Sequence, residues 1–184
     1  MNNQNGQIKM VKNTAKELAQ LAVFVALVIA SQLALSFIAG VEIVTLLFVT
    51  YAFVFGMRRG MLAATVFALV RQLLFGFYPT VLVLYLVYFN GLTAVFGGLG
   101  QKVKNPLKSL WWLTLIACLC TASFTLIDDI LTPLWYRYTE KAMRAHFFAS
   151  LPVAFSQIIC TAVTVALLFF PLYKAFCLIK RKTP

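Results

Sequence analysis

Charged residues are scarce in this chain. They make up 11% of its 184 residues, and only five are acidic, against 16 lysines and arginines. An average soluble domain carries about 25% charged residues. Together with the mean hydropathy of +0.89, this scarcity excludes a soluble globular domain. It also excludes a disordered chain, which combines low hydrophobicity with many charges.

Residues that bind metals are also few. The single histidine, His146, falls in a predicted outer loop beside Arg144, and we expect it to be solvated, as we do Glu42 in the first outer loop. The cysteines lie within or at the ends of apolar runs, and their spacing indicates neither a metal site nor a disulfide framework. We expect them to be small apolar packing residues; they are Cys118, Cys120, Cys160 and Cys177.

No soluble catalytic or nucleotide-binding module is recognisable. The glycine-rich segment 97–102 lacks the G-x-x-x-x-G-K-[ST] spacing of a phosphate-binding loop and ends an apolar run. The net charge of +11 does not indicate a nucleic-acid partner, because the basic residues form short clusters between apolar runs and no single basic face.

Long apolar runs are what the chain has in abundance. A membrane helix needs about 20 mostly apolar residues, because the hydrocarbon core is about 30 Å thick and each residue rises about 1.5 Å. The predicted spans are residues 18–38, 43–57, 61–78, 80–100, 110–135 and 148–173, of which the second is short. We therefore expect one all-α integral membrane domain over residues 1–184, with six transmembrane helices.

The basic residues are distributed unequally between the two sides of such a domain. With the N-terminus inside, the outer segments hold only Arg137, Lys141 and Arg144, and Arg71 lies within the third span. The other 12 lysines and arginines fall on the inner side. Since cytoplasmic loops carry the excess of lysine and arginine, both termini are predicted to be cytoplasmic.

Three ionisable residues fall inside predicted spans, where charge is costly and often functional. Arg71 lies about halfway along the third span, and Asp128 and Asp129 lie in the outer part of the fifth. Consecutive helical residues point about 100° apart, so one aspartate is placed to face Arg71 while the other faces an outer loop. Two interpretations are open: a structural ion pair that locks two helices, or charged groups on the wall of a ligand pocket.

The outer halves of the predicted helices also carry polar and aromatic residues. A mostly apolar cavity with a few directional polar groups is typical of small-molecule sites. The candidates are Tyr78, Tyr85, Tyr88, Asn90, Trp135, Tyr136 and Gln157. An interfacial aromatic belt would equally account for Tyr78, Trp135 and Tyr136. Hydrogen bonds between helices would account for Asn90 and Gln157.

The first span carries a stripe of small residues. Ala22, Ala26 and Ala30 recur every four residues and share one helix face. Small residues at this spacing form a shallow groove that allows another helix to approach closely. That second helix belongs either to this chain or to a separate protein.

Together these features resemble the substrate-binding S components of energy-coupling factor (ECF) vitamin transporters. The resemblance covers the whole chain: its length, six spans, two inner termini and the Ala-x-x-x-Ala stripe. It implies an importer in the cell membrane of a prokaryote, in which Ala22, Ala26 and Ala30 dock onto a transmembrane coupling subunit. Two cytoplasmic ATPases on that subunit would bind ATP and Mg²⁺, so this chain would be no enzyme and would hold no cofactor. The implied vitamin-binding residues, near the outer surface, are Arg71, Tyr78, Tyr85, Tyr88, Asn90, Asp128, Asp129, Trp135 and Gln157.

Two segments resemble the cobalamin-specific S components of the CbrT type. They are residues 71–79, Arg-Gln-Leu-Leu-Phe-Gly-Phe-Tyr-Pro, and residues 128–135, Asp-Asp-Ile-Leu-Thr-Pro-Leu-Trp. The resemblance implies that the transported ligand is cobalamin, together with its precursor cobinamide. Another vitamin, such as pantothenate, is the alternative within the family.

Two other classes of function are open on the residues alone. An intramembrane enzyme would use Asp128 and Asp129 as paired acid and base, but adjacent helical residues diverge and no second catalytic motif accompanies them. A stand-alone secondary transporter would need no ATPase partners, but six spans without a visible inverted repeat argue against the common transporter plans. We therefore expect a binding subunit.

Overall fold

The computed structural model describes residues 2–38, 43–103 and 105–182. Over these ranges the chain forms six helices and no strand. In chain order they are α1 (Asn2–Leu35), α2 (Val44–Phe55), α3 (Met57–Phe75), α4 (Pro79–Lys102), α5 (Leu110–Trp135) and α6 (Glu140–Lys182). The prediction of an all-α fold is confirmed.

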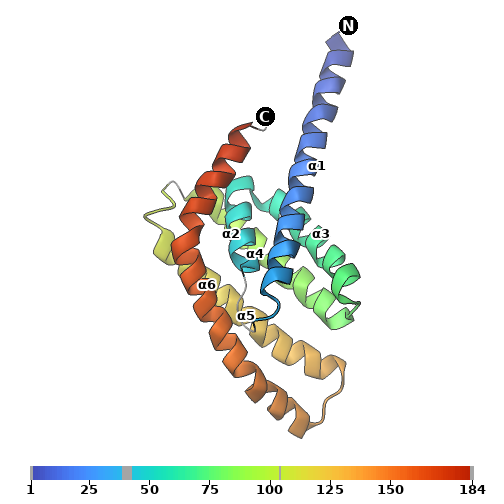
Figure 1. Cartoon of the computed structure of the whole chain (residues 1–184), viewed down its shortest axis with the longest axis vertical. Helices are drawn as coiled ribbons and strands as arrows, with labels where there is room; N and C mark the ends of the chain where they lie inside the picture. Colours follow the sequence, from blue (N-terminus) through green and yellow to red (C-terminus); the bar gives the residue numbers. More distant parts are fainter. Residues whose placement is uncertain (1, 39–42, 104, 183–184) are drawn as a thin grey trace.

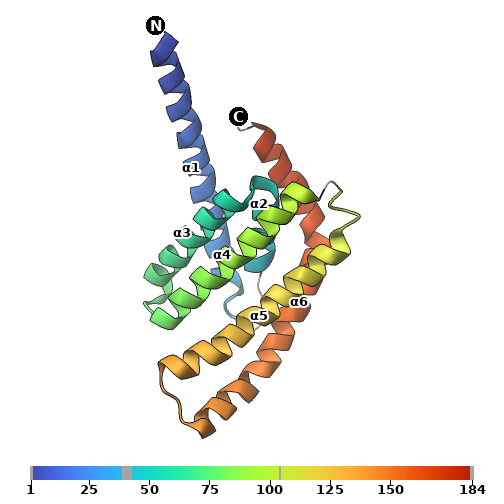
Figure 2. The same ribbon diagram turned by 180° about the vertical axis from the view of Figure 1, so that it is seen from behind.

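Successive helices run in opposite directions (Figures 1 and 2). As a result, the first turns of α1 and the last turns of α6 lie at one end of the molecule, which we call the terminal end. The α3–α4 and α5–α6 connections lie toward the opposite end, which we call the hairpin end. Two turns that are far apart in the sequence therefore belong to the same end of the molecule.

α2 is the central helix of the fold. Every residue from Val44 to Val54 is buried, because α2 packs against each of the other five helices. Its 12 residues span only about 18 Å at 1.5 Å per residue, which is less than a hydrocarbon core of about 30 Å. The second predicted span, residues 43–57, is therefore a short helix that its neighbours surround.

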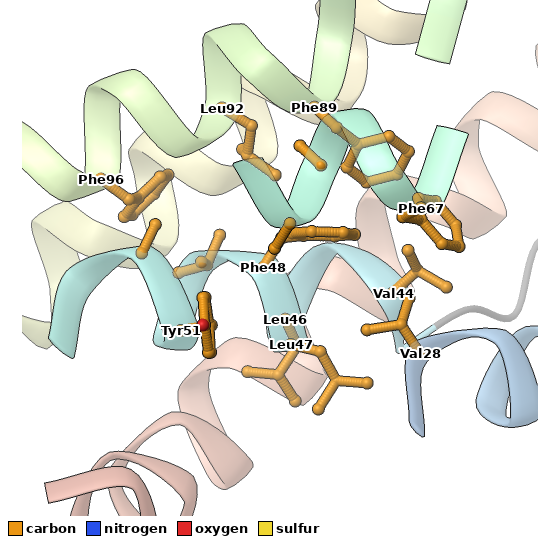
Figure 3. Packing of buried hydrophobic residues seen from close by; sticks show 14 of the residues in the cluster. Val28, Val44, Leu46, Leu47, Phe48, Tyr51, Phe67, Phe89, Leu92 and Phe96 are labelled. Carbon is orange, nitrogen blue, oxygen red and sulfur yellow. The ribbon is translucent and has the colours of Figure 1, made fainter. Parts of the chain in front are cut away.

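Aromatic rings form the centre of the core (Figure 3). Phe48 of α2 has no exposed surface. Its ring centroid lies 5.4 Å from that of Phe24, 5.3 Å from that of Phe67 and 4.8 Å from that of Phe89. Since these partners belong to α1, α3 and α4, one side chain joins four helices. Tyr51, one turn further along α2, stacks on Phe24 at 3.9 Å and extends the cluster.

Two glycines allow α4 to cross the end of α2 at very short range. A Cβ atom added at Gly100 would lie 2.1 Å from the carbonyl oxygen of Phe53, and one added at Gly97 would lie 2.4 Å from the amide nitrogen of Met57. Steric repulsion forbids both distances. The glycine-rich end of α4 therefore serves helix packing. At Gly56 a φ of +89°, which glycine adopts readily, turns the chain sharply from α2 into α3.

Four helices formed by the described residues are long and apolar enough to cross a membrane. They comprise Ala15–Leu35 within α1, Pro79–Lys102, Leu110–Trp135 and Glu140–Arg181 within α6. Large apolar side chains stand on their surfaces; Val23, Leu119 and Leu167 are 70%, 60% and 68% exposed. Exposed apolar surface on this scale is unusual for a soluble monomer and indicates a membrane protein.

The first and last helices extend beyond the predicted spans. α1 begins at Asn2, whereas the first span begins at residue 18, and α6 covers Glu140–Lys182, whereas the last span covers 148–173. Hydropathy marks only the apolar part of a helix, and at the start of α6 glutamate, lysine and arginine continue it because they are good helix formers. At 43 residues, α6 is about 64 Å long, twice what the hydrocarbon core needs.

The middle helices agree more closely with the predicted spans. The spans 80–100 and 110–135 correspond to α4 and α5. α3 ends at Phe75, earlier than the predicted residue 78, because Gly76 has a φ of +97° and leaves the helical conformation. The hairpin turn is therefore short, and Pro79 already opens α4.

Candidate functional site

Arg71 lies against two aromatic rings near the hairpin end. Its guanidinium carbon is 4.3 Å from the ring centroid of Tyr85 on α4 and 5.0 Å from that of Phe75 on its own helix. The hydroxyl of Tyr85 accepts a hydrogen bond of 3.1 Å from Nε2 of Gln32 on α1. We call Gln32, Arg71, Phe75 and Tyr85 the arginine–tyrosine cluster. Three helices thus contribute to one polar and aromatic group.

Tyr88 extends this cluster toward α2 and α5. Its side chain is buried, and its hydroxyl lies 3.4 Å from Oγ1 of Thr45 on α2. Its ring centroid lies 4.7 Å from that of Phe124 on α5, which is also 5.9 Å from the ring of Tyr85. Tyr85 and Tyr88, which the sequence places on one face of a helix, therefore both face the interior of the bundle.

Gln72 holds the turn between α3 and α4. It is 4% exposed, and its Oε1 accepts a hydrogen bond of 3.0 Å from the backbone N–H of Tyr78. Three buried polar atoms in this region have no hydrogen-bond partner among the described residues: Gln72 Nε2, Arg71 Nε and Gln32 Oε1. Because most buried polar atoms in proteins are hydrogen-bonded, this concentration marks a candidate binding site.

A second polar group joins α5 to α6. Asp129 is 9% exposed, and its Oδ2 accepts a hydrogen bond of 2.9 Å from Oγ of Ser150. Nε2 of His146 lies 3.7 Å from Oδ1 of Asp129, and within the described chain neither of these two buried atoms has a hydrogen-bond partner. We call Asp129, His146 and Ser150 the aspartate–histidine cluster. It ties the two helices together beside their connecting turn.

The position of His146 corrects the prediction that it is a solvated loop residue. α6 begins at Glu140, so His146 is helical and faces α5 with its side chain only 28% exposed. Its ring centroid also lies 5.9 Å from that of Tyr138. The segment before residue 148 is polar enough to look like a loop, but in the fold it continues the last helix.

The structure decides against one of the two open interpretations, an ion pair between Arg71 and an aspartate: among the described residues neither aspartate carboxylate is paired with this guanidinium. Asp129 faces α6, and Asp128 accepts a hydrogen bond of 2.7 Å from Oγ1 of Thr132, one turn further along α5. The reason is that α5 packs along α6, whereas Arg71 is held by rings from α3 and α4. Arg71 also lies one turn from the end of α3, not at its middle.

The other predicted binding residues do not join either cluster. Asn90 donates hydrogen bonds to Oγ1 of Thr65 at 3.3 Å and to the carbonyl oxygen of Leu86 at 2.8 Å, which supports the interpretation as a contact between helices. Gln157 is half-buried on α6. Tyr78 and Trp135 are each 54% exposed, and Tyr136 is similarly exposed, as an interfacial aromatic belt requires. Glu42 lies outside the described residues.

The alanine stripe is open on the surface of α1. Ala22, Ala26 and Ala30 are all exposed, so packing within the described chain does not account for them. A groove of about 310 Å³ adjoins the stripe between α1, α2 and α6. Its apolar lining consists mainly of Ala19, Val23, Phe24, Leu27, Tyr51, Phe55, Phe176 and Ile179.

Neither polar cluster presents the donor set of a metal site. In the ranges that the structure describes, no three His, Cys, Asp or Glu side chains lie close enough to hold a metal ion. What the clusters do present are amide, hydroxyl, guanidinium and carboxylate groups beside aromatic rings. Such a mixture suits the non-covalent binding of a small molecule.

Sequence reasoning missed Gln32 and Phe75 of the arginine–tyrosine cluster and Ser150 of the aspartate–histidine cluster. It also missed two residues beside the clusters, Gln72 and Phe124. A signal was present for the two glutamines, since a polar amide within an apolar run is itself a candidate for function. Phe124 and Ser150 gave none, because phenylalanine and serine are ordinary residues of membrane helices and only the packing of α4, α5 and α6 brings them to the clusters.

Comparison with known proteins adds no assignment. No family model matches the chain, and no curated protein or solved structure is significantly similar to it.

Proposed function

We propose that this protein is the substrate-binding S component of an ECF-type importer that takes up a vitamin, with cobalamin and its precursor cobinamide as the transported ligands. ATP hydrolysis would take place in two cytoplasmic ATPases, which hold ATP and Mg²⁺ and act through a transmembrane coupling subunit. The observation that carries this proposal is the exposed stripe of Ala22, Ala26 and Ala30 on α1.

The alanine stripe supports the proposal of a partner protein because no other described helix covers it. Alanines that recur every four residues let a second helix approach closely, and in this fold the other helices pack elsewhere on α1. The adjoining groove of about 310 Å³ adds an apolar channel of the kind that an apolar helix fills. A coupling subunit that contributes membrane helices is a suitable partner for this face.

The proposed topology has six membrane helices and both termini in the cytoplasm. Two observations support it: the first turns of α1 and the last turns of α6 lie at one end of the molecule (Figure 1), and 12 of the 16 basic residues fall in the segments that the sequence predicts to be on the inner side. An excess of basic residues is typical of the cytoplasmic side. The hairpin end would then face outward in the cell membrane of a prokaryote.

The proposed ligand site lies at the hairpin end, opposite the termini. Both polar clusters are near this end, as an importer that captures its ligand from outside requires. The residues that would contact the vitamin include Arg71, Tyr85 and Tyr88, with Asp129 on the facing hairpin. Binding needs no catalytic group, so this chain itself would be no enzyme.

The first experiment is a titration of the purified chain in detergent with cyanocobalamin, dicyanocobinamide, pantothenate and riboflavin. Saturable one-to-one binding of a corrinoid supports the proposal. Binding of pantothenate or riboflavin alone would keep the S-component assignment and overturn the choice of ligand. Absence of binding by a folded sample would overturn the proposal in favour of a stand-alone transporter or an enzyme.

A substitution within the stripe tests the docking surface. Ala26→Leu fills the shallow groove on α1, so it should reduce ATP-dependent uptake at least about tenfold while leaving vitamin affinity unchanged, since close helix approach depends on small residues. Uptake is measured in cells that also express an ECF coupling subunit and its ATPases. Ala166→Leu is the matched control, because Ala166 is an exposed alanine on α6. Equal uptake by the Ala26→Leu and Ala166→Leu variants would show that the stripe is not part of the docking surface.

A further inference from the structure

The charge of Arg71 is not compensated within the described chain. The four described acidic residues are engaged elsewhere: Glu17 pairs with Arg59 and Glu140 with Arg144, while Asp128 and Asp129 bind side chains of the α5–α6 hairpin. Around Arg71 itself the contacts are the faces of Phe75 and Tyr85. An aromatic face attracts a cation but carries no negative charge that would neutralise it.

The groups around the guanidinium are arranged for a polar ligand. Gln32 donates through Nε2 to the hydroxyl of Tyr85, which leaves its Oε1 buried without a partner in the described chain. Arg71 Nε is likewise buried and has no partner there. The guanidinium is planar and presents its donors in a fork that matches the oxygens of a carboxylate or a phosphate. Neither this donor nor the charge of Arg71 is therefore engaged by an acidic side chain of the described chain.

We infer that Arg71, held against the rings of Phe75 and Tyr85, forms a subsite for an anionic oxygen group of the ligand. This inference rests on the proposed function, and it makes Arg71 a specificity-determining residue. Cobalamin carries one phosphodiester, in the arm that links the corrin ring to its nucleotide base, whereas cobinamide lacks that group. The subsite therefore binds the phosphodiester of cobalamin and has no equivalent contact with cobinamide.

The test compares two corrinoids on the same purified protein. Arg71→Gln should weaken the affinity for cyanocobalamin at least about tenfold, which corresponds to the loss of one charge-assisted contact of about 1.4 kcal/mol or more. The same variant should change the affinity for dicyanocobinamide less than about twofold. Arg71→Lys, which keeps the charge but loses the fork, should lie between the two. Arg58→Gln, an exposed arginine at the terminal end, is the matched control and should change neither affinity.

Several outcomes would overturn the subsite. Equal weakening for both corrinoids would show that Arg71 acts through packing. Unchanged affinity for both, with a phospholipid that native mass spectrometry finds on the wild type and not on Arg71→Gln, would assign the guanidinium to a lipid phosphate. Recovery of cyanocobalamin affinity in the double variant Arg71→Gln/Glu42→Gln would show that the guanidinium of Arg71 pairs with Glu42 and not with the ligand.

The same titrations separate failure of the subsite from failure of the proposed function. Wild-type protein that binds cyanocobalamin while Arg71→Gln binds it equally well contradicts the subsite alone. Wild-type protein that binds neither corrinoid contradicts the choice of cobalamin and, with it, the phosphodiester. Melting temperatures of all variants show whether each is folded, and Arg71→Lys keeps the comparison valid if Arg71→Gln does not fold.

Discussion

Asp129 is the most deeply buried acidic side chain in the described part of the chain, at 9% exposure. One of its oxygens is bound by Ser150, and the other faces His146 across 3.7 Å. Asp128, its neighbour in the sequence, is half-buried and bonded only within its own helix. At the scale of single residues, two adjacent aspartates therefore have different roles. Asp129 joins α5 to α6, whereas Asp128 accepts a hydrogen bond from a side chain of its own helix.

This difference predicts unequal effects of removing the two carboxylates. Asp129→Ala should lower the free energy of unfolding by about 1–3 kcal/mol, because it removes the acceptor of a buried hydrogen bond and leaves His146 without its neighbour. Asp128→Ala is the matched control and should cost less than about 1 kcal/mol. The measurement is unfolding in mixed detergent micelles. An Asp129→Ala variant as stable as Asp128→Ala would contradict a structural role for the aspartate–histidine cluster.

At the scale of the helices, the core depends on how closely α4 approaches α2. Phe48 and its aromatic neighbours fill the space between α2 and three other helices, and Gly97 and Gly100 bring the backbone of α4 against the end of α2. Protein interiors are packed at nearly crystalline density, so an extra methyl group at such a contact would overlap with the neighbouring backbone.

Gly98 and Gly100, near the end of α4, should therefore respond differently to alanine. Gly100→Ala should destabilise the protein by about 1–3 kcal/mol or more, because its Cβ meets the backbone oxygen of Phe53 at 2.1 Å. At Gly98 an added Cβ has nothing within 4 Å, so Gly98→Ala should be neutral or stabilise by up to about 1 kcal/mol through helix propensity. Melting temperatures of the two variants provide the measurement. A Gly98→Ala variant that is the less stable of the pair would contradict the close approach.

At the scale of the whole molecule, the two ends differ in chemistry. The terminal end carries the first turns of α1 and the last turns of α6, and the apolar groove opens between these two helices and α2. The alanine stripe follows the second half of α1, beside this groove. The hairpin end carries the arginine–tyrosine and aspartate–histidine clusters. For the proposed importer, this separation would let the ligand and the partner bind at different parts of the molecule.

The orientation can be checked by labelling single cysteines in a variant whose four native cysteines are replaced by alanine. A membrane-impermeant maleimide added to intact cells should label Thr139→Cys in the α5–α6 connection, because that connection is expected to face outward. It should label Lys108→Cys in the α4–α5 connection only after the membrane is opened, since basic segments are retained inside. Both positions are exposed in the fold. The reverse pattern would invert the proposed topology.

Much of the helical layout was predictable from the sequence. The spans 80–100 and 110–135 agree with α4 and α5 because apolar runs bounded by proline or lysine mark a membrane helix clearly. The starts of α1 and α6 were not predictable from hydropathy, because both consist mainly of polar residues that extend a helix without any apolar signal. The depth of burial of α2 was not predictable either, since a uniformly apolar run looks the same whether lipid or protein surrounds it.

The sequence by itself determined that this protein is all-helical and belongs in a membrane, because the cost of leaving so much apolar surface in water depends on composition alone. It also identified Arg71, Asp129 and the alanine stripe as unusual residues for their positions. Only the tertiary structure decided what they contact: Arg71 meets Tyr85 and no aspartate, Asp129 meets Ser150 and His146, and the alanines remain uncovered. Such contacts depend on which helices pack together and at what rotation, and residue spacing along one helix does not specify either.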